Sequence, residues 1–581
     1  MMPRVDADTM GLSMLEALRA REAAGRPIGV ALVGAGAMGI GIAWQVGRTR
    51  GMRLVSITDL DLDHARQAAD AHGGPSAVVG PGDALPPRGT TLLTRSPFFL
   101  LDRPELGIDV LVEATNTNGF AGEVCLRAIE HGIDVVLMNA EVDLTLGPLL
   151  GHEAAARGVV VTSDAGDQHG VLMRMIDEIE MWAFRVVMAG NIKGFLDRYA
   201  TAESIAEEAR IRNLNPVQRC AYTDGTKLNV EMALVANAAG LVPWVPGMEG
   251  PRAARVEDVF QRFDFDKYGT TGVVDYILGA EPGGGVFVVG HCDDPLQRQY
   301  LRYYKLGDGP YYLFYRPYHL CHLETTRAIA LAALYRKPVM RPIHGRVADV
   351  YAYAKRDVAA GEAVEHAIGG DHAYGLIQRC DVADAAGMLP IALLEAAGDR
   401  RARFARSVAR DAPIRYDDVV LPDTFLCRQF RRQAEVLAGR GARVTVLEKA
   451  EIVGGLAGGR ERNGNHYDFG VHQLHAFDAA IFEDIRALMG DRLIPTQKAA
   501  LIRYGDGYRR YPLEFFDLLT GIPAWTLARA MAGLVAQQVV NRLRPGPPPA
   551  NAEEALIQLY GRPLYGFFFR DFPHRYWGIP P

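Results

Sequence analysis

The 581-residue sequence lacks several features that mark secreted, membrane-spanning or nucleic-acid-binding chains. Its six cysteines are scattered with no paired spacing, which argues against a disulfide framework and favours reduced thiols. No secretory signal is evident at the start, and no long apolar run is free of both charges and glycines. The formal net charge of −6 gives no general attraction to nucleic acids or anionic membranes. We therefore expect a cytoplasmic protein without nucleic-acid or membrane partners.

The composition is that of a folded protein, with 49% hydrophobic and 23% charged residues, and the chain is too long for one core. We predict four parts. A Rossmann-type parallel sheet domain that binds NAD(P) covers residues 1–165, and an α+β substrate and dimerisation domain covers 166–335. A small β domain with its tail covers 336–433, and an incomplete α/β segment covers 434–581.

A glycine loop follows the first apolar run, residues 28–33, which is typical of a buried parallel strand. The first glycine permits a tight turn, the second lets the backbone approach a pyrophosphate, and the third lets helix and strand pack closely. About 20 residues later a second apolar run ends in Asp59, which suits a ribose hydroxyl. The predicted cofactor-binding residues are Gly34, Gly36, Ala37, Met38, Gly39, Asp59, Thr115 and Asn139.

Apolar runs alternate with helical stretches up to about Asp164, which predicts right-handed crossovers and a parallel sheet. Ligands of such sheets bind beyond the carboxyl ends of the strands. Polar residues gather at these predicted strand ends: Glu113, Thr115, Asn139, Glu141, Ser163 and Asp164. This edge is therefore the predicted location of the active site.

Two lysines are the candidate catalytic cations. Lys193 lies in "GNIKGF", and Lys227 follows Asp224 and Thr226 in "TDGTKLN", where a polar loop is expected to lead into an amphipathic helix. An ammonium can stabilise the negative charge that develops on a carbonyl oxygen during reduction, and a carboxylate such as Asp224 can orient it. Solvated surface lysines remain the alternative.

The predicted substrate-binding residues are Glu141, Asn191, Thr226, Arg316 and His319. The Arg316 guanidinium could hold a carboxylate or phosphate, although cation–π packing on neighbouring tyrosines is equally consistent with the sequence. The "HLCH" run at residues 319–322 does not have the spacing of a zinc knuckle, so a buried polar cluster is favoured over a metal site.

Several motifs together resemble the homoserine-dehydrogenase-like proteins: "GAGAMGIGIAWQV", "VEAT", "GIDVVLMNAEVD", "SDAGDQHG", "AGNIKGF" and "TDGTKLNVEMALVANAAGL". The similarity spans residues 28–433 and is greatest to the branch with a carboxy-terminal SAF domain, a β-clip module that "AKRDVAAGEAV" resembles. That branch includes the deoxyxylulose-phosphate reductoisomerase-like enzyme of isoprenoid biosynthesis. The resemblance implies NADPH-linked reduction, a homodimer and an active cleft at Lys193, Asp224 and Lys227.

The resemblance also implies a divalent metal in an isomerisation step, whose ligands the sequence does not assign. Homoserine dehydrogenases carry Asn-Lys where this chain has Asn139, Ala140 and Glu141, which argues against homoserine as substrate. The cofactor stays open between NAD and NADP. Asp59, followed by Leu60 without an arginine, favours NAD, whereas the resemblance favours NADPH.

The last quarter resembles FAD-dependent amine oxidases and protoporphyrinogen-oxidase-like proteins, through "GARVTVLEKAEIVGGLAGG" and "YGRPLYGFFFRDFPHRYWGIPP". The segment preceding the strand that ends in Glu448 contains no glycine loop, so we expect no tight FAD binding. The join is predicted near residues 431–435. The apolar stretch 524–543 is expected to form a helix lying on a core.

The sequence as a whole predicts an NAD(P)-dependent oxidoreductase that reduces a small polar carbonyl or sugar-phosphate-like substrate. Two alternatives remain: a non-catalytic dinucleotide-binding sensor or scaffold, and a bifunctional enzyme with an additional flavin oxidoreductase half.

Overall fold

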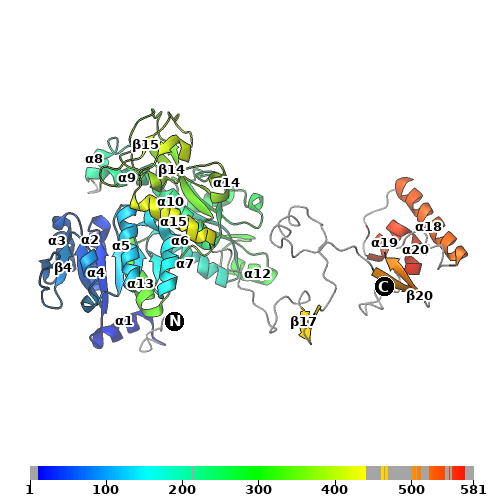
Figure 1. Cartoon of the computed structure of the whole chain (residues 1–581), viewed down its shortest axis with the longest axis horizontal. Coiled ribbons are helices and arrows are strands. Elements are labelled where there is room, and N and C mark those ends of the chain that lie inside the picture. The colour runs from blue at the N-terminus through cyan, green and yellow to red at the C-terminus, as the bar shows by residue number, and fades with distance from the viewer. Residues whose placement is uncertain are drawn as a thin grey trace. The chain divides into compact units, whose positions relative to one another are not determined.

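The computed structural model describes residues 11–211 and 215–439, and beyond them residues 459–462, 465–468, 500–504, 507–511, 523–543, 549 and 552–568 (Figure 1). The chain divides into two compact units, Met1–Arg443 and Val444–Pro581. The predicted site residues lie in the first unit. The strand that ends in Glu448 and the glycine pair that follows it lie outside the described residues.

A seven-stranded parallel sheet begins the first unit, with the order β3-β4-β2-β1-β5-β6-β7. Its strands are β1 (Ile28–Val33), β2 (Met52–Thr58), β3 (Ser76–Val78), β4 (Thr91–Thr94), β5 (Val110–Glu113), β6 (Asp134–Leu137) and β7 (Val161–Ser163). The accompanying helices are α1 (Met14–Ala23), α2 (Ala37–Arg48), α3 (Leu62–His72), α4 (Phe98–Leu101), α5 (Asn118–Glu130) and α6 (Ala140–Arg157). The predicted Rossmann-type α/β fold is confirmed.

The sequence predicted β1, β2, β5, β6 and β7 but not the two strands at the sheet edge. β3 and β4 have only three and four residues, and a segment rich in glycine and proline separates them. Their hydrophobic signal is therefore too short to be distinguished from loop. This omission matters, because β4 delivers a residue to the cofactor cleft.

A five-stranded mixed sheet with the order β12-β11-β8-β10-β9 follows. Its strands are β8 (Arg185–Lys193), β9 (Val242–Pro243), β10 (Val273–Leu278), β11 (Val286–His291) and β12 (Tyr311–Arg316). The helices of this region are α7 (Gln168–Met181), α8 (Ala206–Ile211), α9 (Pro216–Thr223), α10 (Thr226–Ala239), α11 (Val259–Arg262), α12 (Pro295–Tyr303) and α13 (Cys321–Tyr335). The last of these returns to the Rossmann domain and packs on α2 and β6.

Helix α10 is buried along its whole length, so the expectation of an amphipathic helix was wrong. A helix without an exposed face must satisfy its polar side chains inside the protein. Asn229 Oδ1 accepts a hydrogen bond from Ile377 N at 2.9 Å, and Asn237 Oδ1 accepts from Val347 N and Ala348 N at 2.8 and 2.9 Å. These amides tie α10 to the next domain.

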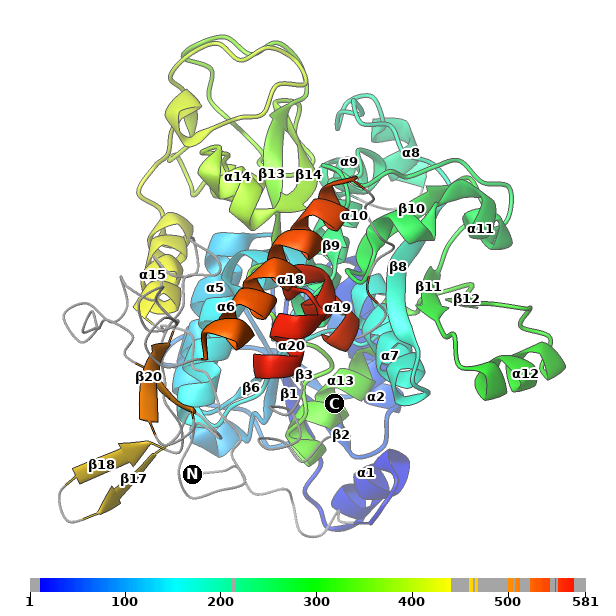
Figure 2. The ribbon, with the colours of Figure 1, turned by 90° about the vertical axis from the view of Figure 1, so that its right-hand side faces the viewer.

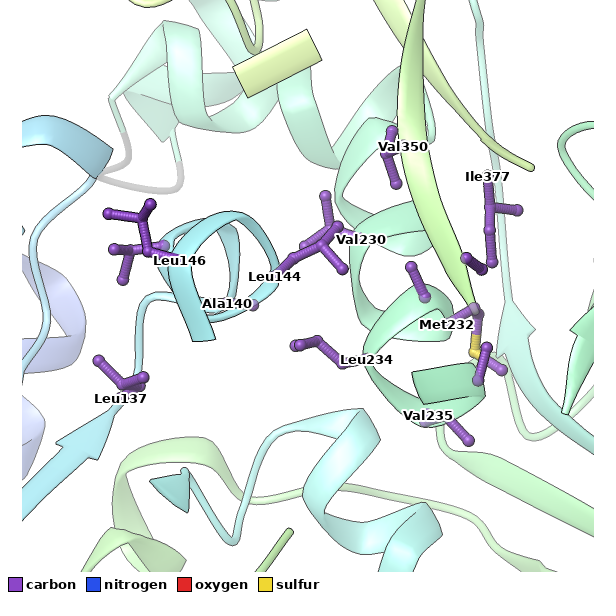
Figure 3. Close-up of a cluster of buried hydrophobic side chains, with 14 of the residues drawn as sticks. Leu137, Ala140, Leu144, Leu146, Val230, Met232, Leu234, Val235, Val350 and Ile377 are labelled. Carbon is purple, nitrogen blue, oxygen red and sulfur yellow. The ribbon is translucent and has the colours of Figure 1, made fainter. Parts of the chain in front are cut away.

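That domain contains two small antiparallel sheets, β13 (Ala348–Ala354) with β14 (Ala373–Arg379), and β15 (Arg403–Phe404) with β16 (Val419–Val420), together with α14 (Cys380–Ala385). Figure 3 shows Leu144 of α6 pointing toward Val230 of α10, with Val350 and Ile377 from β13 and β14 on the far side of the helix. These residues belong to one hydrophobic cluster, which joins the three parts of the unit.

Helix α15 (Phe425–Gly439) lies beside α5 and α6 in both views (Figures 1 and 2). Its Gln433 side chain accepts a hydrogen bond from Leu149 N and donates one to Thr145 O, both at 2.9 Å. These backbone groups flank Pro148, whose ring disturbs the preceding turn of α6. The predicted join at residues 431–435 therefore lies inside a helix that is anchored to the Rossmann domain.

The second unit contains two strand pairs and three described helices. They are β17 (Gly459–Arg462), β18 (Asn465–Asp468), β19 (Ala500–Tyr504), β20 (Gly507–Tyr511), α18 (Ala524–Leu543), α19 (Ala552–Tyr560) and α20 (Arg562–Phe568). The helix predicted at 524–543 is present. It packs on α19 and α20 and buries Ala530, while Val535, Val539 and Val540 are each at least half exposed. No helix among the described residues meets the length and hydropathy needed to span a bilayer.

Replacing Gln433 should destabilise the first unit. In Gln433→Ala, the buried Leu149 N–H and Thr145 carbonyl lose their partner, which costs about 1–3 kcal/mol of unfolding free energy. Pulse proteolysis in urea, following the fragment of the first unit, measures this change. Gln429→Ala on the same helix is the control, and equal midpoints for the two variants would contradict the role of Gln433.

Candidate active site

Two adjoining cavities lie along the carboxyl edge of the Rossmann sheet. One, of about 730 Å³, is lined by the glycine loop and by residues that follow β2 and β4. The other, of about 440 Å³, extends toward α10 and the small β domain. Both cavities are lined by Gly36, Ala37, Ala114, Thr115, Asn116, Thr117, Asn215 and Gln218. They therefore form one cleft, as predicted from the strand ends.

The glycine loop lets neighbouring backbone and a bound ligand come close to its main chain. Gly34 has φ +96°, and a Cβ there would lie 2.6 Å from the carbonyl of Ala114, so no other residue fits without displacement. Around Gly36, by contrast, a Cβ would meet no atom within 4 Å. Gly36 precedes α2 and offers no side-chain cap, so the first amides of that helix are available to an anion.

Asp59 lies beside this loop as predicted. Its Oδ2 accepts a hydrogen bond from Ala35 N at 2.7 Å, and its Oδ1 accepts one from Asp61 N at 2.9 Å. The carboxylate therefore positions the glycine loop as well as facing the cofactor cavity. His64 Nδ1 lies 3.8 Å from Asp59 Oδ1, and the His64 side chain lines the same cavity.

Arg95 also lines this cavity and is exposed there, directly after β4. The sequence prediction had considered only the residue next to Asp59, Leu60, and found no arginine. Because β4 pairs with β2 in the sheet, a residue 36 positions further along the chain reaches the same end of the cleft. A long-range strand pairing of this kind left no local signal.

At the carboxyl ends of β5 and β6, hydrogen bonds link three of the predicted residues: Glu113, Thr115 and Asn139. Thr115 N donates to Glu113 Oε1 at 2.9 Å, and Asn139 caps α6 by accepting from Val142 N at 3.2 Å. Burial raises the pKa of Glu113 to about 7, although hydrogen bonds from Thr115 and Asn139 oppose the shift. Thr115 lines both cavities, and Asn139 lines the 440 Å³ cavity, so their predicted contact with a cofactor stays a prediction.

Lys227 and Glu141 form the central ion pair of the 440 Å³ cavity. Lys227 Nζ lies 3.0 Å from Glu141 Oε2, and the lysine side chain is only 9% exposed. Burial by itself would lower the pKa of Lys227, but the carboxylate of Glu141 and other nearby acids outweigh it, so the pKa is raised. The ammonium therefore stays charged across the physiological range.

Lys193 has a similar partner but lies outside the residues that line the cavity. Its Nζ is 3.8 Å from Glu231 Oε2, and Asn191 Nδ2 donates to the same oxygen at 3.3 Å. Burial raises the pKa of Glu231 to about 7. Glu231 and Lys227 lie one turn apart on α10, so Lys193, Asn191 and Glu231 form a second layer behind the Lys227 pair.

The predicted pairing of Asp224 with Lys227 was wrong. Asp224 Oδ2 instead accepts a hydrogen bond from Lys355 Nζ at 2.8 Å, and both side chains are almost completely buried. Lys355 Nζ also donates to Ala200 O and Gly370 O. Thr226 Oγ1 accepts from Gly375 N at 2.9 Å. Neither Asp224 nor Thr226 lines the cleft; both attach the start of α10 to the small β domain.

The Arg316 side chain already has partners within the protein, Glu324 and the Tyr318 ring. Its guanidinium lies 2.6 Å from Glu324 Oε1 and stacks over the Tyr318 ring, 4.6 Å from the centroid. The cation–π alternative therefore describes Arg316, together with an ion pair. His319 lies closer to the cleft, with Nδ1 3.4 Å from Cys321 Sγ and 3.8 Å from Asp167 Oδ1.

The 440 Å³ cavity is also lined by Asp167, Cys321 and Tyr222, none of which was among the predicted site residues. Asp167 caps α7, and Cys321 begins α13. His169 is buried beside them, and neither of its ring nitrogens has a hydrogen-bond partner within the described part of the chain. Asp167 and His169 belong to the quoted motif "SDAGDQHG", whose chemistry becomes apparent only when α13 is packed against it.

Residues 166–325 match the family model described as the catalytic domain of the oxidoreductase DRL. Residues 433–490 match an NAD(P)-binding Rossmann-like domain. No curated protein matches the chain. The second match begins within α15 and covers the first part of the segment, residues 434–581, that was predicted to resemble a flavoprotein.

Among solved structures, the chain resembles a probable dehydrogenase from Thermotoga maritima, with 11% identity and TM-score 0.32, covering 54% of this chain and 90% of that one. It also resembles a myo-inositol dehydrogenase from Corynebacterium glutamicum, with 12% identity and TM-score 0.28, covering 50% and 75%. A third similar structure is an oxidoreductase from Agrobacterium radiobacter in complex with NAD+, L-tartaric acid and magnesium. Its identity is 12% and its TM-score 0.23, and the match covers 29% of this chain and 45% of that one.

Residues 166–325, which match an oxidoreductase catalytic domain, directly follow a Rossmann sheet with a glycine loop, and this order of domains is typical of NAD(P)-dependent oxidoreductases. The matched range contains Lys193, Lys227, Asp167 and Cys321, and the last three of these line the 440 Å³ cavity.

Glu113 should give the stability a distinctive pH dependence. A carboxyl group whose pKa rises from 4.5 to about 7 on folding stabilises the protein fully below pH 4.5 and loses that contribution as the pH passes 7. Glu113→Gln is neutral in both states, so its stability relative to the natural chain should rise by up to about 3 kcal/mol across this window.

Thermal melting between about pH 5 and about pH 8 measures this difference. Glu105→Gln, at an exposed position, is the control. A constant difference between Glu113→Gln and the natural chain at every pH would show that Glu113 is ionised in the folded protein.

Proposed function

We propose that the protein uses a nicotinamide cofactor to reduce a small, polyhydroxylated carbonyl compound. One observation carries the proposal: the buried Lys227–Glu141 pair lines a 440 Å³ cavity that is continuous with the glycine-loop cavity. A fixed positive charge beside a dinucleotide site suits a reaction in which negative charge develops on oxygen.

The residues present fit a dinucleotide. The open space at Gly36 and the uncapped amides of α2 suit a pyrophosphate, and Asp59, His64 and Arg95 surround the far end of the cavity, where the adenosine ribose would lie. When bound, the nicotinamide supplies the hydride. Thr115 and Asn139 are the proposed contacts near the reacting end.

Lys227 is the proposed electrostatic catalyst. Its ammonium would donate a hydrogen bond to the carbonyl oxygen and stabilise the charge that develops there, while Glu141 Oε2 holds Nζ in place. Because its pKa is raised, Lys227 is a poor proton donor, so its role is that of a fixed charge rather than a general acid.

The lining supports neutral, hydroxyl-rich substrates over phosphorylated ones. Amide side chains from Asn116, Asn118, Asn139, Asn215 and Gln218 line the cavity with the carboxylates Glu141, Asp167, Glu365 and Glu395. Among the described residues, Lys227 and His366 are the lining groups able to carry positive charge. Amides and carboxylates bind hydroxyl groups well, whereas a phosphate favours arginines and lysines.

The family resemblance implies a divalent metal, whose ligands would have to come from the same cleft. Within the described residues, the metal-capable group is Asp167, His319 and Cys321, whose donors are oxygen, nitrogen and sulfur. Magnesium prefers oxygen ligands, so this mixed set of donors does not suit a magnesium ion. The proposed function is limited to reduction of the carbonyl, and the isomerisation step that the resemblance implies is not part of it.

The second unit is proposed not to bind FAD tightly, since the glycine loop expected before Glu448 is absent from the sequence. A homodimer, implied by the family resemblance, remains a prediction.

Loss of the Lys227 charge should slow catalysis much more than cofactor binding. In Lys227→Met we expect kcat to fall about 100- to 1000-fold while the NADPH dissociation constant changes little. A panel of ketoses, aldoses and phosphorylated analogues, followed by nicotinamide absorbance, measures turnover. Lys267→Met, in an ion pair with Glu249 remote from the cleft, is the matched control.

The natural chain also separates the two classes of function. Cofactor binding without oxidation by any carbonyl compound would indicate the sensor alternative and contradict the enzymatic proposal. Full turnover by Lys227→Met would remove Lys227 from the role proposed for it.

Arg95 supports NADP as the preferred cofactor. The carboxylate of Asp59 already accepts two backbone hydrogen bonds, and the exposed Arg95 guanidinium lines the same cavity, where it could bind a ribose phosphate. We expect Arg95→Ala to weaken NADPH binding about tenfold and NADH binding little, as measured by calorimetry. The exposed Arg88→Ala is the control, and equal losses for both cofactors would argue against phosphate recognition by Arg95.

A further inference from the structure

Three side chains that converge beside Lys227 have the arrangement of a metal site. Asp167 lies at the start of α7, and His319 and Cys321 lie around the start of α13, so the packing of α13 on α7 brings them together. Their ligand atoms all lie within 4.8 Å of one another. Asp167 and Cys321 also line the 440 Å³ cavity, which leaves the group open on the substrate side.

The distances suit a small tetrahedral ion. Cys321 Sγ lies 3.4 Å from His319 Nδ1 and 3.8 Å from Asp167 Oδ1, and the last two atoms are 3.8 Å apart. Metal–ligand bonds of 2.0–2.3 Å in a tetrahedral zinc site give separations between ligand atoms of about 3.3–3.7 Å. The three donors therefore need to move only a few tenths of an ångström to share an ion.

Gln168 provides an independent indication. Its Nε2 lies 3.1 Å from His319 Nε2, while its buried Oε1 has no hydrogen-bond partner within the described residues. Exchanging the two amide atoms, which have almost the same shape, lets Oε1 accept a hydrogen bond from His319 Nε2–H. That bond leaves His319 Nδ1 unprotonated and facing Cys321, which is how an outer residue orients a metal-binding histidine.

We propose that Asp167, His319 and Cys321 bind one zinc-class divalent ion, whose fourth position faces the substrate cavity and takes a hydroxyl or carbonyl oxygen. The Cys321 thiol loses its proton to solvent when the ion binds, while His319 and Asp167 bind as the neutral imidazole and the carboxylate. Oxygen, nitrogen and sulfur together favour zinc or cobalt over magnesium and calcium. The substrate-oxygen part rests on the proposed function, whereas ion binding does not.

Cobalt(II) titration of the full chain, without an affinity tag and after removal of metals by a chelator, tests the site. We expect about one equivalent to bind with a thiolate-to-cobalt absorption band in the near ultraviolet, and zinc to abolish that band. The other five cysteines are buried, so the band reports on Cys321. Absence of the band in the natural chain would overturn the proposal without any need for variants.

Variants locate the site. Cys321→Ser should lose the band, His319→Ala should weaken cobalt binding at least tenfold, and Gln168→Ala should weaken it about tenfold through the orientation of His319. His322→Ala, whose ring instead lies beside Gly41, should bind cobalt like the natural chain. Persistence of the band in Cys321→Ser would also overturn the assignment, and circular dichroism confirms that each variant is folded.

NADPH titration and carbonyl turnover on the same preparations separate this inference from the proposed function. Cofactor binding and turnover without a cobalt band would overturn the metal site and leave the enzymatic proposal intact. A cobalt band that depends on Cys321, without turnover of any carbonyl compound, would support the metal site and overturn the enzymatic proposal.

Discussion

The burial of helix α10 on all sides is the constraint that organises this protein. A helix in that position has little solvent to satisfy its polar side chains, so they need hydrogen-bond partners within the protein. Asn229 and Asn237 bind the backbone of the small β domain, and Lys227 reaches the Rossmann domain through Glu141. Lys227 is thus held by a helix that cannot shift without breaking contacts with both neighbours.

The same constraint sorts the charged residues into two groups. Asp224 and Lys355 are buried together and make hydrogen bonds with backbone groups, which leaves them little freedom to take part in a reaction. Lys227 Nζ also lies in an ion pair, 3.0 Å from Glu141 Oε2, but this pair borders a cavity. Both lysines are paired with a carboxylate, and they differ in that Lys227 borders the 440 Å³ cavity whereas Lys355 lines neither cavity of the cleft.

Local patterns predicted the elements that depend on nearby residues. The glycine loop, five strands of the Rossmann sheet and the edge that carries Glu113 and Asn139 follow from short-range spacing and hydrophobic runs. The pairing of Asp224 with Lys355 spans 131 residues, and Arg95 reaches Asp59 only through a four-residue strand. Neither has a local signal. Amphipathicity misled for α10 because a second domain covers the face that the sequence alone assigns to water.

Pro148 in α6 bears on where the first unit ends along the chain. The side chain of Gln433 makes hydrogen bonds with the backbone of α6 at the turn that Pro148 disturbs. Gln433 is remote from this turn in sequence and is the first residue of the second family match. A segment that resembles the start of another fold is therefore a structural component of the first one. Any rearrangement that exchanged the downstream unit would have to retain α15 at least as far as Gln433, because a recombination point placed where the second match begins would remove a hydrogen-bonding partner of α6.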